Sequence, residues 1–245
     1  MSSTPPVAGR TVSSASSPEP SESAAADSDS LVTTDHPGID KLLALLAYGE
    51  VAAFYRLTEE ARMAPNLAGR INMASMAAAE MGHYDLLRDA LRRRGVDVIP
   101  AMSHYASTLE DYHQLTTPST WLEALVKTYV GDALAADFYL EIADVLPHEV
   151  ADVVRGVLAE TGHSQFVVAE VRAAVAASDV HRSRLALWSR RLLGEAITQA
   201  QYVLAEHDDL VDLVMAGTAG LVQMTEFFDR LQRTHAERMQ QLGLG

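Results

Sequence analysis

The sequence contains no cysteine. This absence excludes disulfides, thiolate zinc sites, iron–sulfur clusters and thiol catalysis, so nitrogen and oxygen atoms must hold any metal ion. No segment approaches the roughly 20 uninterrupted apolar residues of a membrane-spanning helix. Basic residues are also few: 19 Lys and Arg against 33 Asp and Glu give a net charge of −14, which argues against a broad electrostatic contact with nucleic acid or membrane. We therefore expect a soluble, cytoplasmic protein that does not bind membranes.

The first 36 residues contain no aromatic residue, although the whole sequence has 2 Trp, 8 Tyr and 5 Phe. This segment is rich in Ser, Thr, Pro and Ala, so it cannot bury enough apolar surface to offset the entropy lost on ordering. It also lacks the apolar run of a signal peptide and the arginines of a transit peptide. We predict a disordered tail over residues 1–36 and one helical domain over residues 37–245.

Beyond the tail the sequence is rich in Ala, Leu, Met, Glu and Arg, without the period-two alternation of strands, so we predict an all-α fold. The third helix is expected to begin at Thr117-Pro118, and the last to be interrupted near Gly217 and Gly220. The predicted helices span residues 39–63, 66–94, 118–145, 147–177, 180–206 and 209–242.

A connection of about twenty residues separates the second and third predicted helices, whereas the other joints are short. Two antiparallel helix pairs joined by a long crossover are typical of ferritin-like four-helix bundles. We therefore predict such a bundle over residues 39–177, with two additional C-terminal helices over residues 180–242.

One short motif occurs twice in the predicted helices, because residues 80–83 and 160–163 both read Glu-x-Gly-His. Positions i and i+3 share one helix face, so a carboxylate and an imidazole there can bind the same metal ion. The spacing alone is weak evidence, because 16 Glu and 9 His give about 0.6 chance matches to Glu-x-x-His. A third match, at residues 110–113, falls in the long connection, where we expect a solvated loop.

The other two helices of the predicted bundle each offer a carboxylate. Glu50 lies in an apolar stripe 30 residues before Glu80, where a lone carboxylate is costly unless it is paired or metal-bound. Asp132 lies in a similar stripe 28 residues before Glu160. Because Glu141 shares its face with other acids, we prefer Asp132, with Glu141 as the alternative.

A carboxylate followed by Glu-x-x-His, given twice in one helical chain, resembles the ferritin-like di-iron carboxylate superfamily. Within it, the chain is similar in general character to the bacterial tRNA hydroxylases that oxidise a methylthio-isopentenyl-adenosine. The superfamily usually has Glu where this sequence has Asp132. The resemblance implies two metal ions, the first bound by Glu50, Glu80 and His83 and the second by Asp132, Glu160 and His163, with Glu80 and Glu160 as bridges.

Carboxylate and imidazole ligands without a thiolate suit iron or manganese. The resemblance implies two Fe(II) ions, dioxygen as co-substrate, hydroxylation of a C–H bond and electrons from a separate reductase. The substrate is either a modified tRNA, which would have to contact the arginines within residues 88–94 and 182–191, or a small molecule. The two C-terminal helices either cover the site or form a homodimer.

Several other polar residues are placed by helical spacing alone. Glu195 is either a further ligand, a group that supports the ligands, or a buried acid paired with an arginine. Glu59 and Glu60 share a face with Arg56, so we expect them to be solvated. Three tyrosines are candidates for hydrogen bonds to the ligands, or for simple core packing: Tyr84, Tyr129 and Tyr139.

Two functions other than an oxygenase stay open. A ferritin-like protein could bind and oxidise iron without modifying a substrate. A non-catalytic bundle could instead use the same acids and histidines as a buried polar network.

The ligand assignment predicts that Glu160→Ala abolishes bound iron, because the substitution removes a carboxylate expected to bridge both ions. Elemental analysis of protein purified from iron-supplemented cells measures the outcome. Full retention of two irons per chain would contradict the assignment.

Overall fold

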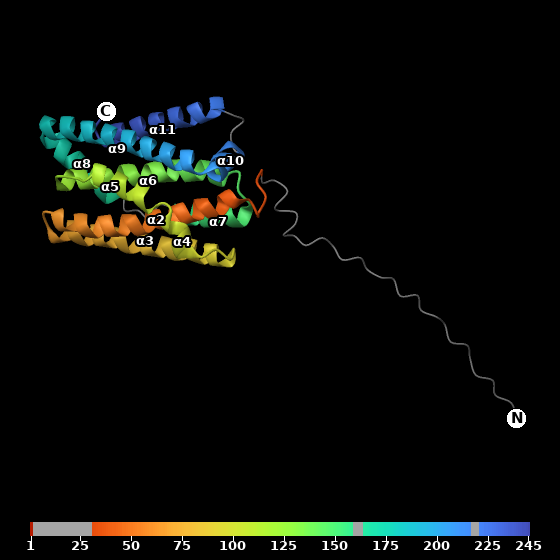
Figure 1. The fold of residues 1–245 in the computed structure, drawn as a ribbon. Coiled ribbons are helices and arrows are strands. Elements are labelled where there is room, and N and C mark those ends of the chain that lie inside the picture. Colours follow the sequence, from red (N-terminus) through yellow and green to blue (C-terminus); the bar gives the residue numbers. More distant parts are fainter. Residues whose placement is uncertain (2–30, 159–163, 217–220) are drawn as a thin grey trace.

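The structure, a computed structural model, describes the first residue and residues 31–158, 164–216 and 221–245. Within these residues every regular element is a helix, and the helices form a bundle with further helices packed on it (Figure 1). The predicted all-α architecture is confirmed. In the described part of the chain, no helix has the length and apolarity needed to cross a membrane.

The described helices follow the predicted order. They are α2 (Pro37–Glu60), η2 (Ala61–Met63), α3 (Leu67–Arg93), α4 (Val98–Ser103), α5 (Ala106–Leu115), α6 (Trp121–Ala143), α7 (His148–Val157), α8 (Ser164–Ala177), α9 (Asp179–Glu206), α10 (Asp208–Ala216) and α11 (Leu221–Gln241).

Capping side chains fix where the long helices begin. The Asn66 side chain accepts a hydrogen bond from the Gly69 amide at 2.8 Å and starts α3. Helix α6 begins at Trp121 rather than at the predicted Thr117-Pro118, because Thr120 is the capping residue. The Glu123 side chain accepts a hydrogen bond from the backbone N–H of Ser119 at 2.7 Å, close to a capping-box arrangement.

In two places the structure has two helices where the sequence predicts one. Helices α7 and α8 replace the single helix predicted over residues 147–177, and residues 159–163, with Glu160 and His163, lie outside the described residues. Helices α10 and α11 lie on either side of the interruption expected near Gly217 and Gly220 in the last predicted helix, and this interruption also lies outside the described residues.

The start of the folded unit precedes the predicted boundary at residue 37. Residues 2–30 of the predicted tail lie outside the described residues. Val32, in contrast, is buried in the core, and the carbonyl oxygen of Thr34 accepts a hydrogen bond from Arg94 at 2.9 Å. The ring of His36 accepts a hydrogen bond from the Gly38 amide at 3.0 Å and caps α2.

Helix α6 lies in the middle of the bundle, with the pair α2 and α3 on one side and α9 and α11 on the other (Figure 1). The indole N–H of Trp188 on α9 donates a 2.9 Å hydrogen bond to the Glu123 carbonyl oxygen on α6. Helix α9, predicted as an addition outside the core, therefore packs directly on a central helix.

The long connection contains two helices, α4 and α5, so the solvated loop predicted around residues 110–113 is wrong. Tyr112 and His113 on α5 are half-buried, and Nδ1 of His113 is buried without a hydrogen-bond partner in the described structure. Burial, together with the nearby charges of Arg56 and Lys127, lowers the pKa of His113 to about 3. The imidazole is consequently neutral at ordinary pH.

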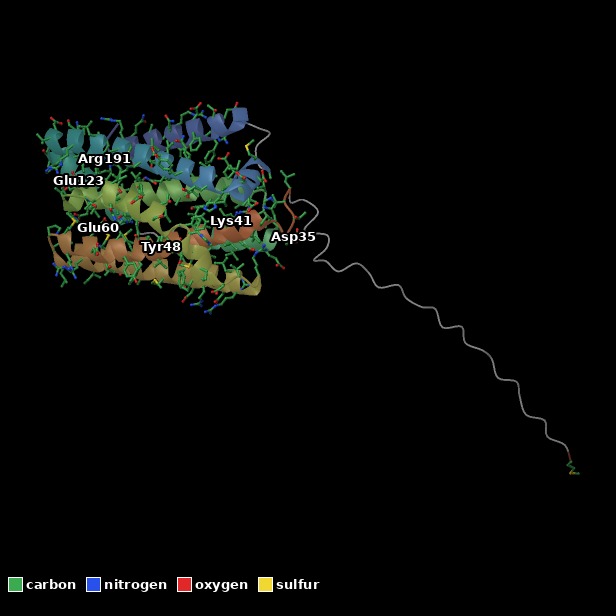
Figure 2. All side chains as sticks on the ribbon, viewed as in Figure 1. Asp35, Lys41, Tyr48, Glu60, Glu123 and Arg191 are labelled. Atoms are coloured by element: carbon green, nitrogen blue, oxygen red, sulfur yellow. The ribbon has the colours of Figure 1, made fainter. Side chains whose placement is uncertain are left out.

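An ionic cluster joins Arg56 and Glu60 of α2 to Lys127 of α6, and it corrects the prediction that Glu60 is solvated. Glu60 is labelled in Figure 2. Glu60 is only 5% exposed. Its carboxylate is 3.0 Å from Nη1 of Arg56 and 3.8 Å from Nζ of Lys127. Arg56 also donates a 3.1 Å hydrogen bond to the Thr128 hydroxyl. Burial and the Arg56 charge lower the pKa of Lys127 to about 7, because one carboxylate is shared between two cations.

This cluster predicts that Glu60→Gln lowers the free energy of unfolding by about 3–5 kcal/mol, because it leaves two buried cations without their counter-ion. Glu59→Gln, at the exposed neighbouring position, is the matched control and should change stability by less than about 0.5 kcal/mol. Urea denaturation followed by circular dichroism measures both values. Equal effects of the two substitutions would show that the buried cluster does not stabilise the fold.

Candidate metal centre

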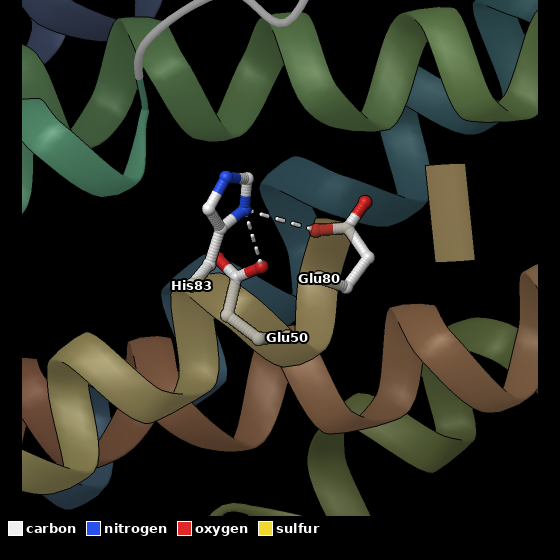
Figure 3. A group of neighbouring side chains, drawn as sticks. All are labelled: Glu50, Glu80 and His83. Carbon is white, nitrogen blue, oxygen red and sulfur yellow. Dashed lines mark hydrogen bonds and ion pairs between the residues drawn. The ribbon is translucent and has the colours of Figure 1, made fainter. Parts of the chain in front are cut away.

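Three side chains that can bind a metal converge where α2 packs on α3 (Figure 3). Glu50 projects from α2, and Glu80 and His83 project from one face of α3. One potential ligand atom of each residue lies within 4.8 Å of those of the other two. Among the described residues, this is the one group of three or more His, Asp or Glu side chains so arranged.

The imidazole of His83 lies between the two carboxylates. Its Nδ1 atom is 3.3 Å from Oε2 of Glu50 and 3.3 Å from Oε2 of Glu80. The three side chains are only 12–20% exposed. They are thus shielded from most of the solvent, but they remain accessible to a small ion.

The pKa values of all three side chains in this cluster are shifted from their ordinary values. Burial raises the pKa of Glu50 to about 8, and the nearby Glu80 carboxylate adds to the effect. Burial also acts to raise the pKa of Glu80, but hydrogen bonds to His83 and Glu50 outweigh it and the pKa is lowered. Hydrogen bonds to both carboxylates raise the pKa of His83 to about 10. Without a metal, an imidazolium is therefore held between the glutamates.

The donor set fits iron or manganese. It contains carboxylate oxygens and one imidazole nitrogen, which are the ligands these metals share, and no thiolate. Two atoms bound to one ion by bonds of about 2.1 Å lie at most about 4.2 Å apart. The two 3.3 Å separations meet this limit, so small side-chain movements suffice to place an ion among the three residues.

Asp132 on α6 interacts electrostatically with this cluster. The residue is exposed, yet nearby protein atoms desolvate its carboxyl and raise its pKa, and the Glu80 carboxylate raises this pKa further. The charges of Arg56 and His83 act in the opposite direction. Asp132 forms no ion pair within the described part of the chain, and it lies outside the 4.8 Å group.

The alternative carboxylate, Glu141, is engaged elsewhere. It forms an ion pair with Arg230 of α11 and is 37% exposed. The remaining predicted ligands, Glu160 and His163, lie outside the described residues. The structure thus brings together three of the six predicted ligands, and Asp132 interacts electrostatically with two of them.

A family model for the ferritin-like domain of actinomycetes matches residues 35–217. The chain belongs to this ferritin-like family. The match extends beyond the predicted core of residues 39–177 and includes α9 and α10, in agreement with the direct packing of α9 on α6. A search of curated proteins finds no match.

The three predicted tyrosines have different environments in this ferritin-like domain. Tyr139 on α6 lies within electrostatic range of Glu50, which together with burial raises the pKa of its phenol. Tyr84 packs on the core, and the guanidinium of Arg88 lies 5.9 Å from its ring centroid. Tyr129 packs beside a second group of core residues. The electrostatic interaction of Tyr139 with Glu50 thus links one of the three tyrosines to a candidate ligand.

The sequence does not predict that Arg56 and Tyr112 lie near the metal centre. For Glu195, one of the three predicted roles, pairing with an arginine, differs from the structure. Arg56 interacts electrostatically with Asp132 and Glu80, and Tyr112 with Asp132 and Glu195. Glu195 is half-buried and forms no ion pair with an arginine among the described residues. For Arg56 the sequence carries no signal, because the burial of its partner Glu60 depends on Lys127 of another helix. For Tyr112 it carries none either, because the position of α5 depends on tertiary contacts.

The geometry predicts that metal binding releases protons and strengthens as the pH rises. A metal needs the unprotonated imidazole and carboxylate, whereas His83, with its raised pKa, holds a proton at neutral pH in the metal-free protein. Between pH 6 and 8 the apparent Kd for Fe(II) should fall about tenfold per pH unit for each proton displaced.

Anaerobic calorimetry in buffers of different ionisation enthalpy counts the released protons. His83→Gln should remove part of the release, whereas His181→Gln, at an exposed position on α9, should leave it unchanged. A pH-independent affinity would show that the imidazolium is not displaced by the metal.

Proposed function

We propose that this ferritin-like chain is a di-iron oxygenase that hydroxylates a small molecule. The observation that carries the proposal is the convergence of Glu50, Glu80 and His83, with potential ligand atoms within 4.8 Å of one another. Carboxylate-rich sites with one histidine per metal, built on facing helices, are the di-iron arrangement of four-helix bundles.

The proposed ligands form two sets. Glu50, Glu80 and His83 hold the first iron. The second would be held by Asp132 of α6, which interacts electrostatically with Glu80 and His83, together with Glu160 and His163. The bridging roles of Glu80 and Glu160 rest on the family resemblance alone.

When bound, two ferrous ions supply the reducing equivalents and open coordination positions for reaction with dioxygen. Insertion of one oxygen atom into a C–H bond, with reduction of the other to water, consumes two electrons and two protons per turnover. A separate reductase supplies the electrons. The residues of the chain hold the metals, and Arg56 offsets part of the negative charge of Glu80 and Asp132.

A purely structural polar network explains the site less well. Glu50, Glu80 and His83 alone could form a closed ionic triad, because one imidazolium satisfies both carboxylates. Asp132 lies outside this triad, and the Glu80 carboxylate acts against its ionisation. A second cation between these two carboxylates would relieve this repulsion.

The charge distribution favours a small molecule over a tRNA. The net charge is −14, and several of the arginines that an RNA would have to contact are engaged within the protein. Arg94 pairs with Asp40, and Arg184 pairs with the buried Glu123 at 2.7 Å. A phosphate backbone would therefore compete with existing ion pairs on an acidic protein.

The proposal predicts that Asp132→Asn lowers the iron content from two per chain to about one, because an amide is a weaker ligand than a carboxylate. Glu141→Gln is the matched control on the same helix and should retain both irons, since Glu141 pairs with Arg230. Elemental analysis of iron-supplemented protein measures the content. Loss of iron in both variants alike would contradict the assignment of Asp132.

Catalysis is tested by supplying the iron-loaded protein with a chemical reductant, ¹⁸O-labelled dioxygen and a panel of small apolar compounds. An oxygenase incorporates ¹⁸O into the product, as mass spectrometry detects. Oxygen consumption without label in any product would indicate iron oxidation alone. A protein that binds no iron after anaerobic reconstitution would refute the proposed function.

A further inference from the structure

A pocket of about 190 Å³ lies between α6 and the surrounding helices α2, α5, α9, α10 and α11. Its walls are mainly apolar and are formed by side chains of these helices. Representative lining residues are Leu42 and Leu45 of α2, Leu134 and Phe138 of α6, Val203 of α9 and Phe228 of α11.

The volume and lining restrict what the pocket can hold. A dry cavity of about 150 Å³ lined by Leu, Ile and Phe accommodates benzene, so this pocket suits a molecule slightly larger than benzene. No charged side chain lines the pocket within the described residues. A charged ligand would therefore lose its hydration without compensation, and an uncharged ligand is favoured.

One polar side chain in the wall carries an amide. Gln199 of α9 is 8% exposed and lines the pocket, and no hydrogen bond joins its side-chain amide to a described residue. A ligand hydroxyl or carbonyl group in the pocket can form a hydrogen bond with this amide in place of water. The other polar lining groups are the phenols of Tyr112 and Tyr139.

The two tyrosines connect this pocket to the candidate metal centre. Tyr139 lies within electrostatic range of Glu50, and Tyr112 within range of Asp132. Gly131, the residue before Asp132 on α6, also lines the pocket. The apolar space is therefore linked to the proposed metal site through Tyr112, Tyr139 and Gly131.

We propose that this pocket binds an uncharged, mainly apolar molecule of the size of a monosubstituted benzene, with one hydroxyl or carbonyl group held by Gln199. Binding itself does not require a metal. That the bound molecule is the substrate of the oxygenase rests on the proposed function.

Benzyl alcohol and toluene are matched probes, because they have nearly the same shape and differ by a hydroxyl group. Titration of the metal-free full-length protein, followed by ligand-observed NMR and calorimetry, should show saturable binding of both. The affinity of each probe is corrected for its free energy of transfer from water to an apolar solvent. After this correction, benzyl alcohol should bind about five- to tenfold more tightly than toluene, which is the contribution of one hydrogen bond. Absence of saturable binding of either probe would overturn the proposal.

Two kinds of substitution test the location. Ala200→Phe fills the pocket from α9 and should weaken binding of both probes at least tenfold, whereas Ala205→Phe, at an exposed position of the same helix, should not. Ala135→Leu fills the pocket from α6 and provides a second variant if Ala200→Phe fails to fold. Unchanged binding in a folded pocket-filling variant would show that the probes bind elsewhere.

Gln199→Leu tests the polar contact. It should remove the advantage of benzyl alcohol over toluene and leave toluene binding intact or stronger. An advantage that persists in this variant would contradict the role of Gln199.

The outcomes separate this inference from the proposed function. Probe binding by a protein that takes up no iron would support the pocket and refute the oxygenase. Iron uptake without probe binding would refute the pocket and leave the metal centre standing.

Discussion

Negative charge held inside the bundle is the constraint on which the rest of this structure depends. Glu50 and Glu80 lie on packed helices, and a carboxylate removed from water costs several kcal/mol unless a cation or hydrogen bonds replace its hydration. In the metal-free chain the imidazolium of His83 supplies this cation, and the raised pKa of Glu50 limits the charge further. The pair α2 and α3 can consequently fold with the ligands already together, before a metal binds.

Arg56 connects this negative charge to the stability of the fold. Its guanidinium pairs with Glu60 and extends its field to Glu80 and Asp132. Lys127 shares the Glu60 carboxylate, so one nearby acid neutralises two cations. Burial and the Arg56 charge therefore lower the pKa of Lys127. Because the cluster is buried, the charges at the metal centre and those between α2 and α6 cannot be changed independently.

Helical periodicity was sufficient to predict the helices and the convergence of Glu50, Glu80 and His83. All three lie on inward faces, and the short connection after η2 returns α3 alongside α2. Periodicity could not show that Glu60 is buried, because an inward-pointing acid is stable only with cations from another helix, here Lys127. The burial of groups on α5 was missed for the same reason: a ten-residue helix within a connection owes its position to tertiary contacts.

The C-terminal helices have a role that a four-helix scheme does not assign to them. Helices α2 and α6 carry carboxylates and, a few turns away, the leucines and aromatic side chains of the pocket. The opposite wall comes from α9, α10 and α11, including the amide of Gln199. Without these helices the apolar faces of α2 and α6 would be open to water, and the pocket would not exist. Because reactions at reduced metal centres require water to be kept from the reacting atoms, these helices would supply part of that cover in the proposed oxygenase.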